Sequence, residues 1–246
     1  MQPAASPESS AETFALFQRL NRQRRAIREF APEPVTDADL EAVLAEACLA
    51  PSSVGLQPYE LHVVKSGEAK ARLATACNGQ RAAKSAACLV VIVAGPGISR
   101  RRIAEAEQHY QSDADLPQRS RDYHLHELAR VRWAHSRWLL PLLALLRGLF
   151  TLLSPARSLL PLGGQGLRQW GARSAMLAAQ TLMLAATARG LDSCPMEGFS
   201  GPAVARVLDL PWDSAPVVVV ALGQRAATAR IEPQWRRARA QMIRTH

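Results

Sequence analysis

The stretch Cys88-Leu-Val-Val-Ile-Val-Ala94 is seven consecutive apolar residues, four of which are β-branched. A strand that faces water on one side alternates apolar and polar residues, whereas a strand covered on both faces has no reason to alternate. The stretch therefore predicts a central strand that is buried on both faces. A second apolar run, 216–222, ends before Gly223 and predicts another buried strand.

Helical patterns and one further strand surround these two runs. We expect a strand over 60–65 and a helix that starts after Thr36 as N-cap, with Asp39 in the capping position, and stops before Pro51. The segment 171–188 predicts a buried helix that ends near Gly190, and shorter helical patterns cover 13–25, 69–76 and 204–208. Helices that alternate with buried strands predict an α/β or α+β fold around one shared core.

The composition predicts a globular chain with an anionic partner. Apolar residues make up 48% of the 246 residues, enough for a large core, and we expect a single domain over 1–246. The formal net charge is +9, and all but three of the 30 basic residues are arginines, whose planar guanidinium suits phosphate. Nucleic acid, an anionic membrane or an anionic cofactor would each balance this charge. Because aromatic residues make up only 5% of the chain, few can stack on bases, and we expect no nucleic-acid partner.

The N-terminal segment and the cysteines indicate a cellular compartment. Residues 1–12 are polar and lack the apolar segment of a secretory signal, so we expect a flexible tail and a cytoplasmic protein. The four cysteines, Cys48, Cys77, Cys88 and Cys194, form no C-x-x-C motif. In a chain of this size we expect them to be small buried apolar residues in a reducing compartment.

Residues 98–165, called the insert below, differ from the rest of the chain. The insert opens with Arg100-Arg101-Arg102, continues as a predicted mixed-charge helix over 103–137 and is leucine-rich over 138–162. Its longest apolar run, which contains Pro141, has nine residues. A membrane span needs ~20, so we reject a transmembrane helix. Three interpretations stay open: a helical excursion that packs in a dimer, a hydrophobic lid over a substrate pocket, or a peripheral membrane anchor through 138–162 with snorkelling arginines.

Motifs for hydrolysis, metal binding and nucleotide binding are absent. The sequence contains no G-x-S-x-G, H-E-x-x-H, Walker A or G-x-G-x-x-G motif, and Gly95-Pro96-Gly97 after the predicted strand is expected to form a turn. His124 and His126 are two residues apart, which on a helix directs them to different faces. We therefore expect no metal site.

Two short segments have the chemistry to hold a phosphorylated ring. Arg24-Arg25-Ala26-Ile27-Arg28 is a dense cationic cluster at the end of a predicted helix. Pro51-Ser52-Ser53-Val54-Gly55-Leu56-Gln57-Pro58 is a loop of small residues with many backbone N–H and hydroxyl donors. A phosphate needs guanidinium groups, and an extended heteroaromatic ring needs small walls that form hydrogen bonds. Taken alone, each segment also fits a solvated helix end or an ordinary turn.

In this order and spacing, the two segments resemble the FMN-dependent nitroreductase family. The family pattern R-R-S-x-R-x-F matches 24–30, its x-P-V matches Pro34-Val35, and its A-P-S-S-x-x-x-Q-P-W matches 50–59. A third block, 170–199, is similar to the family's long central helix, its A-x-G-L-D turn and its P-x-E-G-F loop. The resemblance covers about residues 20–95 and 168–243.

The resemblance implies an α+β nitroreductase-like fold, with a central, mostly antiparallel sheet flanked by helices, in an intertwined homodimer. It also implies roles for residues that match the family's motifs. Contacts with the flavin phosphate, ribityl chain and pyrimidine edge are implied for Arg24, Arg25, Ala26 and Arg28. From the partner subunit, the ring would be lined by Pro51, Ser52, Ser53, Gly55 and Gln57.

Further cofactor contacts are implied by the third block and two shorter matches. The loop of Pro195, Met196, Glu197 and Gly198 would place backbone groups near the reactive flavin nitrogen. Asn78 and Arg81 match a pyrimidine-binding pair, and Arg237 and Arg239 resemble a phosphate clamp, although a basic amphipathic chain end fits them equally. Three positions depart from the family: Ala26 replaces a serine, Gly55 stands where many members have asparagine, and Tyr59 replaces a tryptophan.

As a function, the resemblance implies a flavin oxidoreductase. NAD(P)H would transfer a hydride to FMN, and the reduced flavin would pass two electrons to a small-molecule acceptor such as a nitroaromatic or a quinone. No catalytic side chain is needed, because the protein supplies position and cationic stabilisation. Two alternatives are kept: a flavin-binding protein without turnover, and a binding module at a membrane surface. The acceptor and the choice between NADH and NADPH stay open.

Overall fold

The computed structural model describes residues 7–136, 140–153 and 163–246. Within these ranges, four strands form one antiparallel sheet in the order β1-β2-β4-β3: β1 (Tyr59–Val64), β2 (Cys88–Ala94), β3 (Asp192–Met196) and β4 (Ala215–Gly223). The helices are α1 (Pro7–Gln23), α2 (Asp37–Cys48), α3 (Gly67–Ala76), α4 (Arg81–Ser85), α5 (Pro96–Ser112), α6 (Gln118–Ala134), α7 (Leu140–Leu153), α8 (Gly163–Ala188), α9 (Gly201–Val207) and α10 (Arg239–Met242), with a short 3-10 turn η1 (Ser53–Gly55). The predicted α+β class is confirmed.

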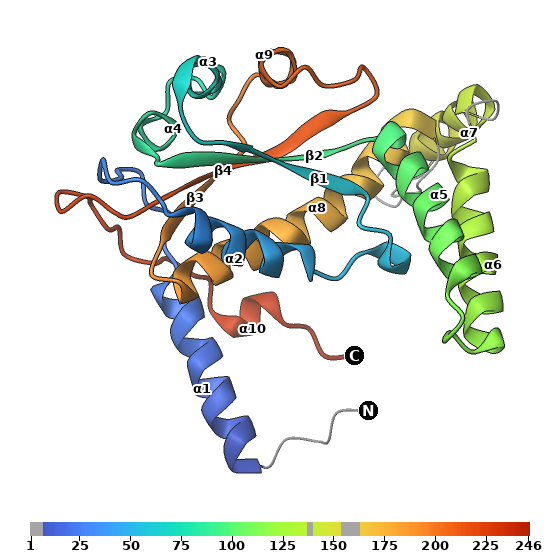
Figure 1. Cartoon of the computed structure of the whole chain (residues 1–246), viewed down its shortest axis with the longest axis horizontal. Helices are drawn as coiled ribbons and strands as arrows, with labels where there is room; N and C mark the ends of the chain where they lie inside the picture. The colour runs from blue at the N-terminus through green and yellow to red at the C-terminus, as the bar shows by residue number, and fades with distance from the viewer. Residues whose placement is uncertain (1–6, 137–139, 154–162) are drawn as a thin grey trace.

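Helices cover both faces of the sheet, which explains why β2 is apolar throughout (Figure 1). Leu89, Val91 and Val93 pack on the face that carries α3, α4 and α9, whereas Val90 and Ile92 pack on the face of α2 and α8. β4 lies beside β2 and alternates between the same two clusters. Both predicted central strands are confirmed, and β1 lies within one residue of its predicted bounds.

Local chemistry sets two helix ends where the sequence predicts them. Thr36 is the N-cap of α2, and its Oγ1 accepts a hydrogen bond from the Asp39 amide at 3.1 Å. The helix α8 ends at Ala188, and Gly190 follows with a φ of +78°, a left-handed conformation that glycine adopts without strain.

Three predictions about the positions of helices and turns are wrong, and α8 begins at Gly163 rather than at the predicted residue 171. α1 begins at Pro7, inside the tail predicted to be flexible over 1–12. α5 begins at Pro96, where a turn is predicted, because a proline in the first helical position loses no hydrogen bond. The helix predicted over 103–137 is two helices, α5 and α6, since Pro117 disfavours helical backbone in the residue before it.

Burial of the cysteines is confirmed for three of the four. Cys77, Cys88 and Cys194 are buried, and burial raises the pKa of Cys77 and of Cys88 to about 11, which keeps both thiols protonated. Cys48 is exposed at the end of α2, so its predicted burial is wrong.

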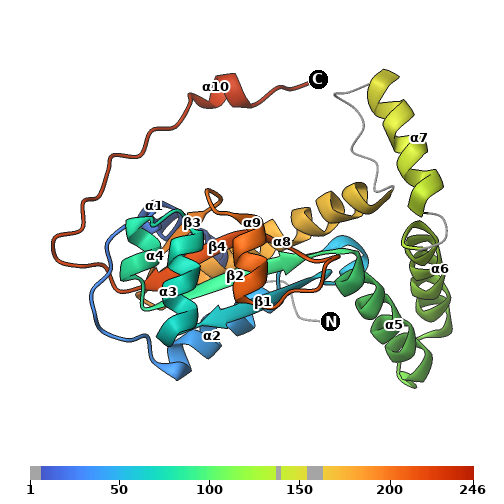
Figure 2. The same cartoon turned by 90° about the horizontal axis from the view of Figure 1, so that it is seen from above.

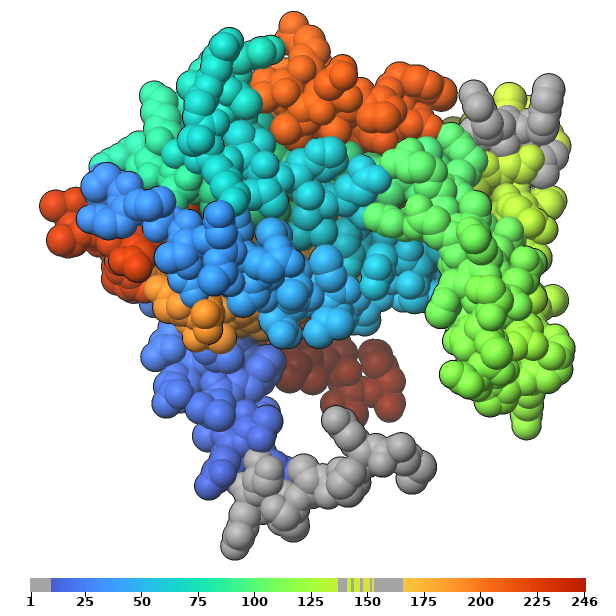
Figure 3. Space-filling view, in the orientation of Figure 1, coloured from blue at the N-terminus to red at the C-terminus, as the bar shows by residue number. Residues whose placement is uncertain are grey.

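Two parts of the chain extend away from the sheet (Figures 1 and 2). The helices α5, α6 and α7 project at one end, and α1 extends from the other, where the C-terminal segment also leaves the sheet before it runs back to α10. Between α1 and the α5–α6 pair the surface is concave (Figure 3). No helix in the described ranges is long and apolar enough to cross a membrane. Of the leucine-rich stretch 138–162, residues 138–139 and 154–162 lie outside the described residues.

Candidate functional site

The predicted arginine cluster lines a polar pocket of about 250 Å³. Arg24, Arg25 and Arg28 lie on the segment that follows α1, and residues 231–236 of the C-terminal segment close the pocket from the other side. The Gln234 side chain donates a hydrogen bond from Nε2 to the Arg24 carbonyl oxygen at 3.4 Å. Segments about 200 residues apart in the sequence therefore build one pocket.

This pocket is strongly cationic. Burial lowers the pKa of Arg24, and the positive charges of Arg236 and Arg25 lower it further. Glu232, the acidic residue among those that line the pocket, forms an ion pair with Arg230 at 2.7 Å. Guanidinium groups that repel one another in a half-buried pocket are stabilised by an anion, and phosphate accepts several of their forked hydrogen bonds at once.

Backbone pairing places the arginine segment beside the third block. Ile27 donates its amide hydrogen to the Ser193 carbonyl at 3.1 Å, and Ala26 and Ser193 form an isolated parallel bridge. Ile27 is fully buried and anchors the segment, whereas the side chain of the neighbouring Arg28 is exposed to solvent. From Ser193 the chain continues along β3 through Pro195 and the buried Met196.

A turn between α3 and α4 joins the same edge. Asn78 Nδ2 and Gln80 Nε2 both donate hydrogen bonds to the Gly198 carbonyl, at 2.9 and 2.8 Å. Asn78 has a φ of +56°, in the left-handed region that asparagine tolerates better than most residues. Arg81, at the start of α4, pairs with Glu29. The structure thus brings 24–29, 78–81 and 195–198 together, with Glu197 and Gly198 exposed.

The loop with Pro51, Ser52, Ser53, Gly55 and Gln57 lies elsewhere. Its turn η1 contacts α6, beside the projecting helices in Figure 1, and none of its residues lines the arginine pocket. Ser52 Oγ accepts a hydrogen bond from the Gln57 amide at 2.8 Å, and φ is positive at Val54, Gly55 and Gln57, so the loop has a defined, tight shape. Within one chain, the two predicted halves of the site are separate.

The C-terminal segment contributes Arg236 to the pocket, rather than the predicted Arg237 or Arg239. The Cζ of Arg237 lies 5.8 Å from the centroid of the Trp235 ring, and Arg239 starts α10 on the surface. Neither Arg236 nor Gln80 was singled out by the sequence. The Asn78–Arg81 spacing marks the turn that contains Gln80, but nothing in the irregular C-terminal segment indicates which arginine turns inward.

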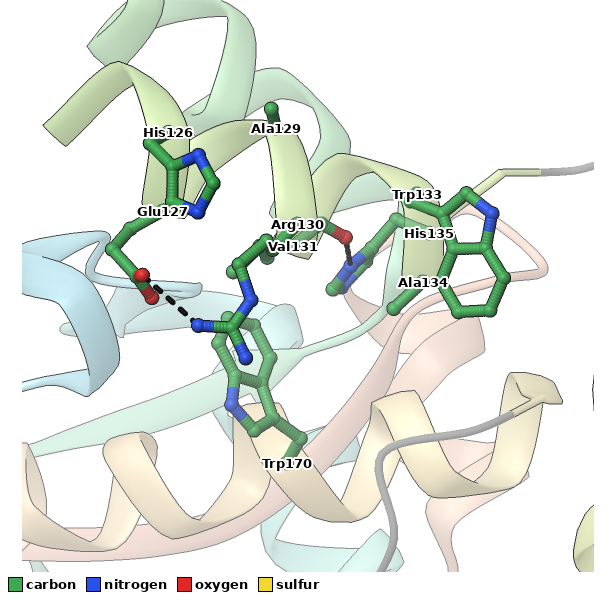
Figure 4. A pocket seen from close by; sticks show the side chains of 9 residues that line it. All are labelled: His126, Glu127, Ala129, Arg130, Val131, Trp133, Ala134, His135 and Trp170. Carbon is green, nitrogen blue, oxygen red and sulfur yellow. Dashed lines mark hydrogen bonds and ion pairs between the residues drawn. The ribbon is translucent and has the colours of Figure 1, made fainter. Parts of the chain in front are cut away.

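A larger and mostly apolar cavity, of about 600 Å³, lies between α6 and α8 (Figure 4). Trp133 and His135 line it from the end of α6, and Trp170 lines it from α8. The rings of His135 and Trp170 meet edge to face, with centroids 5.2 Å apart. Val131 and Trp170 pack against the same buried cluster, of Leu56, Ile103 and Leu128, as Val54 of the small-residue loop. The cavity therefore adjoins the loop that is predicted to line the flavin.

Comparison with known proteins decides the family. The family model described as the nitroreductase family matches residues 22–224. The chain belongs to the nitroreductase family. MhqN of Bacillus subtilis, provisionally named an NAD(P)H nitroreductase, is 26% identical to this nitroreductase over 218 residues, which cover 88% of this chain and 92% of MhqN. A Thermus thermophilus protein named NADH dehydrogenase is 27% identical over 236 residues, which cover 91% and 90% of the two chains.

The fold of this nitroreductase also matches solved structures. A protein of Exiguobacterium sibiricum, solved in complex with FMN, superimposes with a TM-score of 0.70 at 20% identity, covering 100% of this chain and 99% of that one. The predicted nitroreductase-like fold is thereby confirmed. The matched range 22–224 contains the arginine segment, the small-residue loop and the third block, whereas the C-terminal segment that closes the pocket lies beyond it.

Proposed function

We propose that this nitroreductase binds FMN and uses it to transfer electrons from NAD(P)H to a small-molecule acceptor. The arginine pocket carries the proposal. Arg24, Arg25, Arg28 and Arg236 line a space of about 250 Å³, and its acidic lining residue, Glu232, is already paired. A dianionic phosphate matches this pocket in charge and in hydrogen-bonding geometry. The FMN complex of the structural neighbour and the name of MhqN support the choice of cofactor and donor.

The residues around the pocket would position the cofactor. When bound, FMN supplies two-electron redox chemistry between NAD(P)H and an acceptor such as a nitroaromatic or a quinone. Arg24 and Arg25 would hold the phosphate, and the positive charge of Arg28 would favour negative charge on a neighbouring ring. The hydrogen bonds from Asn78 and Gln80 fix the Gly198 peptide, so the exposed backbone of this loop would be held in one orientation toward a bound ring.

We also propose that a homodimer completes the site, with the 51–57 loop of one chain facing the arginine pocket of the other. The separation of the two halves within one chain supports this arrangement. α1 extends from the sheet with Phe14 and Phe17 60% and 48% exposed, and an isolated helix needs such a face covered to be stable (Figure 1). Light scattering should give twice the chain mass of 26.8 kDa, and a monomer fully loaded with FMN would contradict the proposal.

The cofactor is tested on the purified full-length protein. It should be yellow, release FMN on denaturation, lose its colour when NADPH or NADH is added without oxygen, and recover it on addition of a quinone or nitroaromatic. Arg24→Gln/Arg28→Gln should weaken FMN binding at least about 100-fold, since each charged hydrogen bond is worth ~1.5–3 kcal/mol. Arg206→Gln, which removes an exposed arginine from α9, is the matched control and should bind FMN normally.

Two outcomes would decide against parts of the proposal. A colourless protein that takes up no added FMN would exclude the cofactor. A protein that binds FMN but keeps its colour with both nicotinamide donors would be a flavin-binding protein without turnover.

A further inference from the structure

The helix α7 carries an exposed apolar face. Leu142, Leu145, Leu149 and Leu152 are spaced three, four and three residues apart, which places them on one side of a helix. Their exposed fractions are 54%, 71%, 54% and 80%, and Phe150 beside them is 54% exposed. Single exposed leucines are common on proteins, but a continuous apolar stripe of this kind marks an interaction surface.

The sequence on both sides of α7 contains arginines and no acidic residue. Between Glu127 and Asp192 the sequence contains no acidic residue and eight arginines: Arg130, Arg132, Arg137, Arg147, Arg157, Arg168, Arg173 and Arg189. Two of these, Arg168 and Arg173, are exposed on α8, against which α7 packs, and have no ion-pair partner in the part of the chain that the structure describes. Arg130, Arg132 and Arg189 pair with carboxylates. Leucines beside the unpaired Arg168 and Arg173 match a surface that is apolar inside and anionic outside.

The dimensions of α7 fit a helix that lies in a membrane surface. Its 14 residues rise about 21 Å, less than the ~30 Å of a bilayer's hydrocarbon core. Trp133, near the end of α6 that leads to α7, is 57% exposed, and tryptophan is enriched at the membrane–water boundary. Both views of the fold place α7 at the periphery, where a flat surface can approach it (Figures 1 and 2).

A second copy of the chain is the competing occupant of this face. Two such faces in contact would bring Arg168 and Arg173 of one copy toward those of the other, and these unpaired charges repel one another. Of the segments that would need a partner copy, α1 lies at the other end of the molecule from α7, whereas the 51–57 loop contacts α6 (Figure 1). We therefore propose that α7 and the arginines around it dock on an anionic lipid membrane. This inference does not rest on the proposed FMN chemistry.

The experiment measures how the purified full-length protein cosediments with vesicles. Phosphatidylcholine vesicles that contain phosphatidylglycerol should bind the protein, phosphatidylcholine vesicles alone should bind it weakly, and salt should release it. Leu145→Glu/Leu149→Glu should lower binding at least about tenfold. Leu49→Glu, at a leucine that is 75% exposed at the end of α2, is the matched control and should bind as the wild type does. Arg168→Gln/Arg173→Gln should lower binding to anionic vesicles about fivefold per arginine.

Three results would overturn the proposal. The first is that Leu145→Glu/Leu149→Glu binds vesicles as well as the wild type does, and the second is that the wild type binds both kinds of vesicle equally. The third is that the leucine variant differs from the wild type in molar mass, measured by light scattering. The last would make α7 a contact between copies. The milder variant Leu152→Ser repeats the test if the double variant does not fold. FMN content, measured on the same samples, separates this proposal from the one on the cofactor, because α7 contributes nothing to the arginine pocket.

Discussion

The arginines of 24–28 and those of the insert are alike in the sequence but differ in the structure. In the arginine pocket, Arg24, Arg25 and Arg236 converge. Burial lowers the pKa of Arg24, and repulsion from the other two arginines lowers it further. In the insert, helix-surface arginines meet carboxylates, as Arg132 does with Glu107 at 3.0 Å. Exposed pairs of that kind contribute ~0–1 kcal/mol to stability. A ligand site is therefore indicated by arginines that converge without paired carboxylates, and not by the number of arginines.

The packing around the insert is tight where it leaves the sheet and open farther out. The insert leaves the sheet through Gly95, Pro96 and Gly97, where Asp213 lies against both glycines and pairs with Arg100 at 2.6 Å. Farther out, Gly148 of α7 has no neighbour within 4 Å of an added Cβ. We expect substitutions at this junction to affect the whole fold and those in α7 to affect only its surface.

The largest effect is expected for Gly95→Ala. Its Cβ would lie 2.2 Å from the Asp213 carbonyl oxygen and 2.7 Å from the Ser214 Cα, both backbone atoms that cannot rotate away. Overpacking of this kind should cost about 3 kcal/mol of unfolding free energy, measured by chemical denaturation. Gly148→Ala is the control, and it should stabilise α7 by up to ~1 kcal/mol through helix propensity. If both variants are equally stable, the junction is not the rigid point that the structure shows.

A smaller effect is expected when the ion pair at the junction is broken. Asp213→Ala leaves Arg100, whose side chain is 28% exposed, without its carboxylate and should cost about 2 kcal/mol. The matched variant in the insert, Glu107→Ala, frees Arg132, which is 64% exposed and well hydrated, and should cost less than ~0.5 kcal/mol. Denaturation midpoints of the two variants, compared with the wild type, check the contrast, and equal losses would remove it.

How much of the fold could be predicted depends on whether local pattern or tertiary pairing decides an element. β2 is evident from its residues alone, because seven apolar residues in a row, four of them β-branched, favour a doubly covered strand. β3 could not be predicted, since Asp192 and Pro195 are poor strand formers. It exists because its backbone pairs with β4, at the edge position where a proline is tolerated.

The candidate site shows the same division. Arg24, Arg25 and Arg28 could be predicted at a phosphate site because they cluster in the sequence and match the family pattern. In the structure, the buried Ile27 fixes how their segment sits on β3. Arg236 could not, since it follows no periodic pattern and reaches the pocket only through the path of the C-terminal segment. The break between α5 and α6 is local, and Pro117 in the sequence already indicates it.

The smallest effect on stability is expected from a change in pH, which acts through His135 at the apolar cavity between α6 and α8. His135 is 2% exposed, its Nδ1 lies 2.8 Å from the Val131 carbonyl oxygen, and its Nε2 has no hydrogen-bond partner among the described residues. Burial lowers the pKa of His135, and the charge of Arg100 adds to this, while the bond to Val131 acts in the opposite direction.

Because the folded pKa of His135 is depressed, the unfolded chain binds a proton below about pH 6.5 that the folded chain still excludes. The stability that the neutral ring contributes is thus present above this pH and is lost as the pH falls. His135→Asn retains an N–H donor but has no group that titrates, so it should lose less stability than the wild type between about pH 7 and 5. Urea unfolding across this range measures the difference. His126→Asn, at an exposed position on the same cavity, should follow the wild type, and a parallel decline of His135→Asn and wild type would show that the ring is not held neutral.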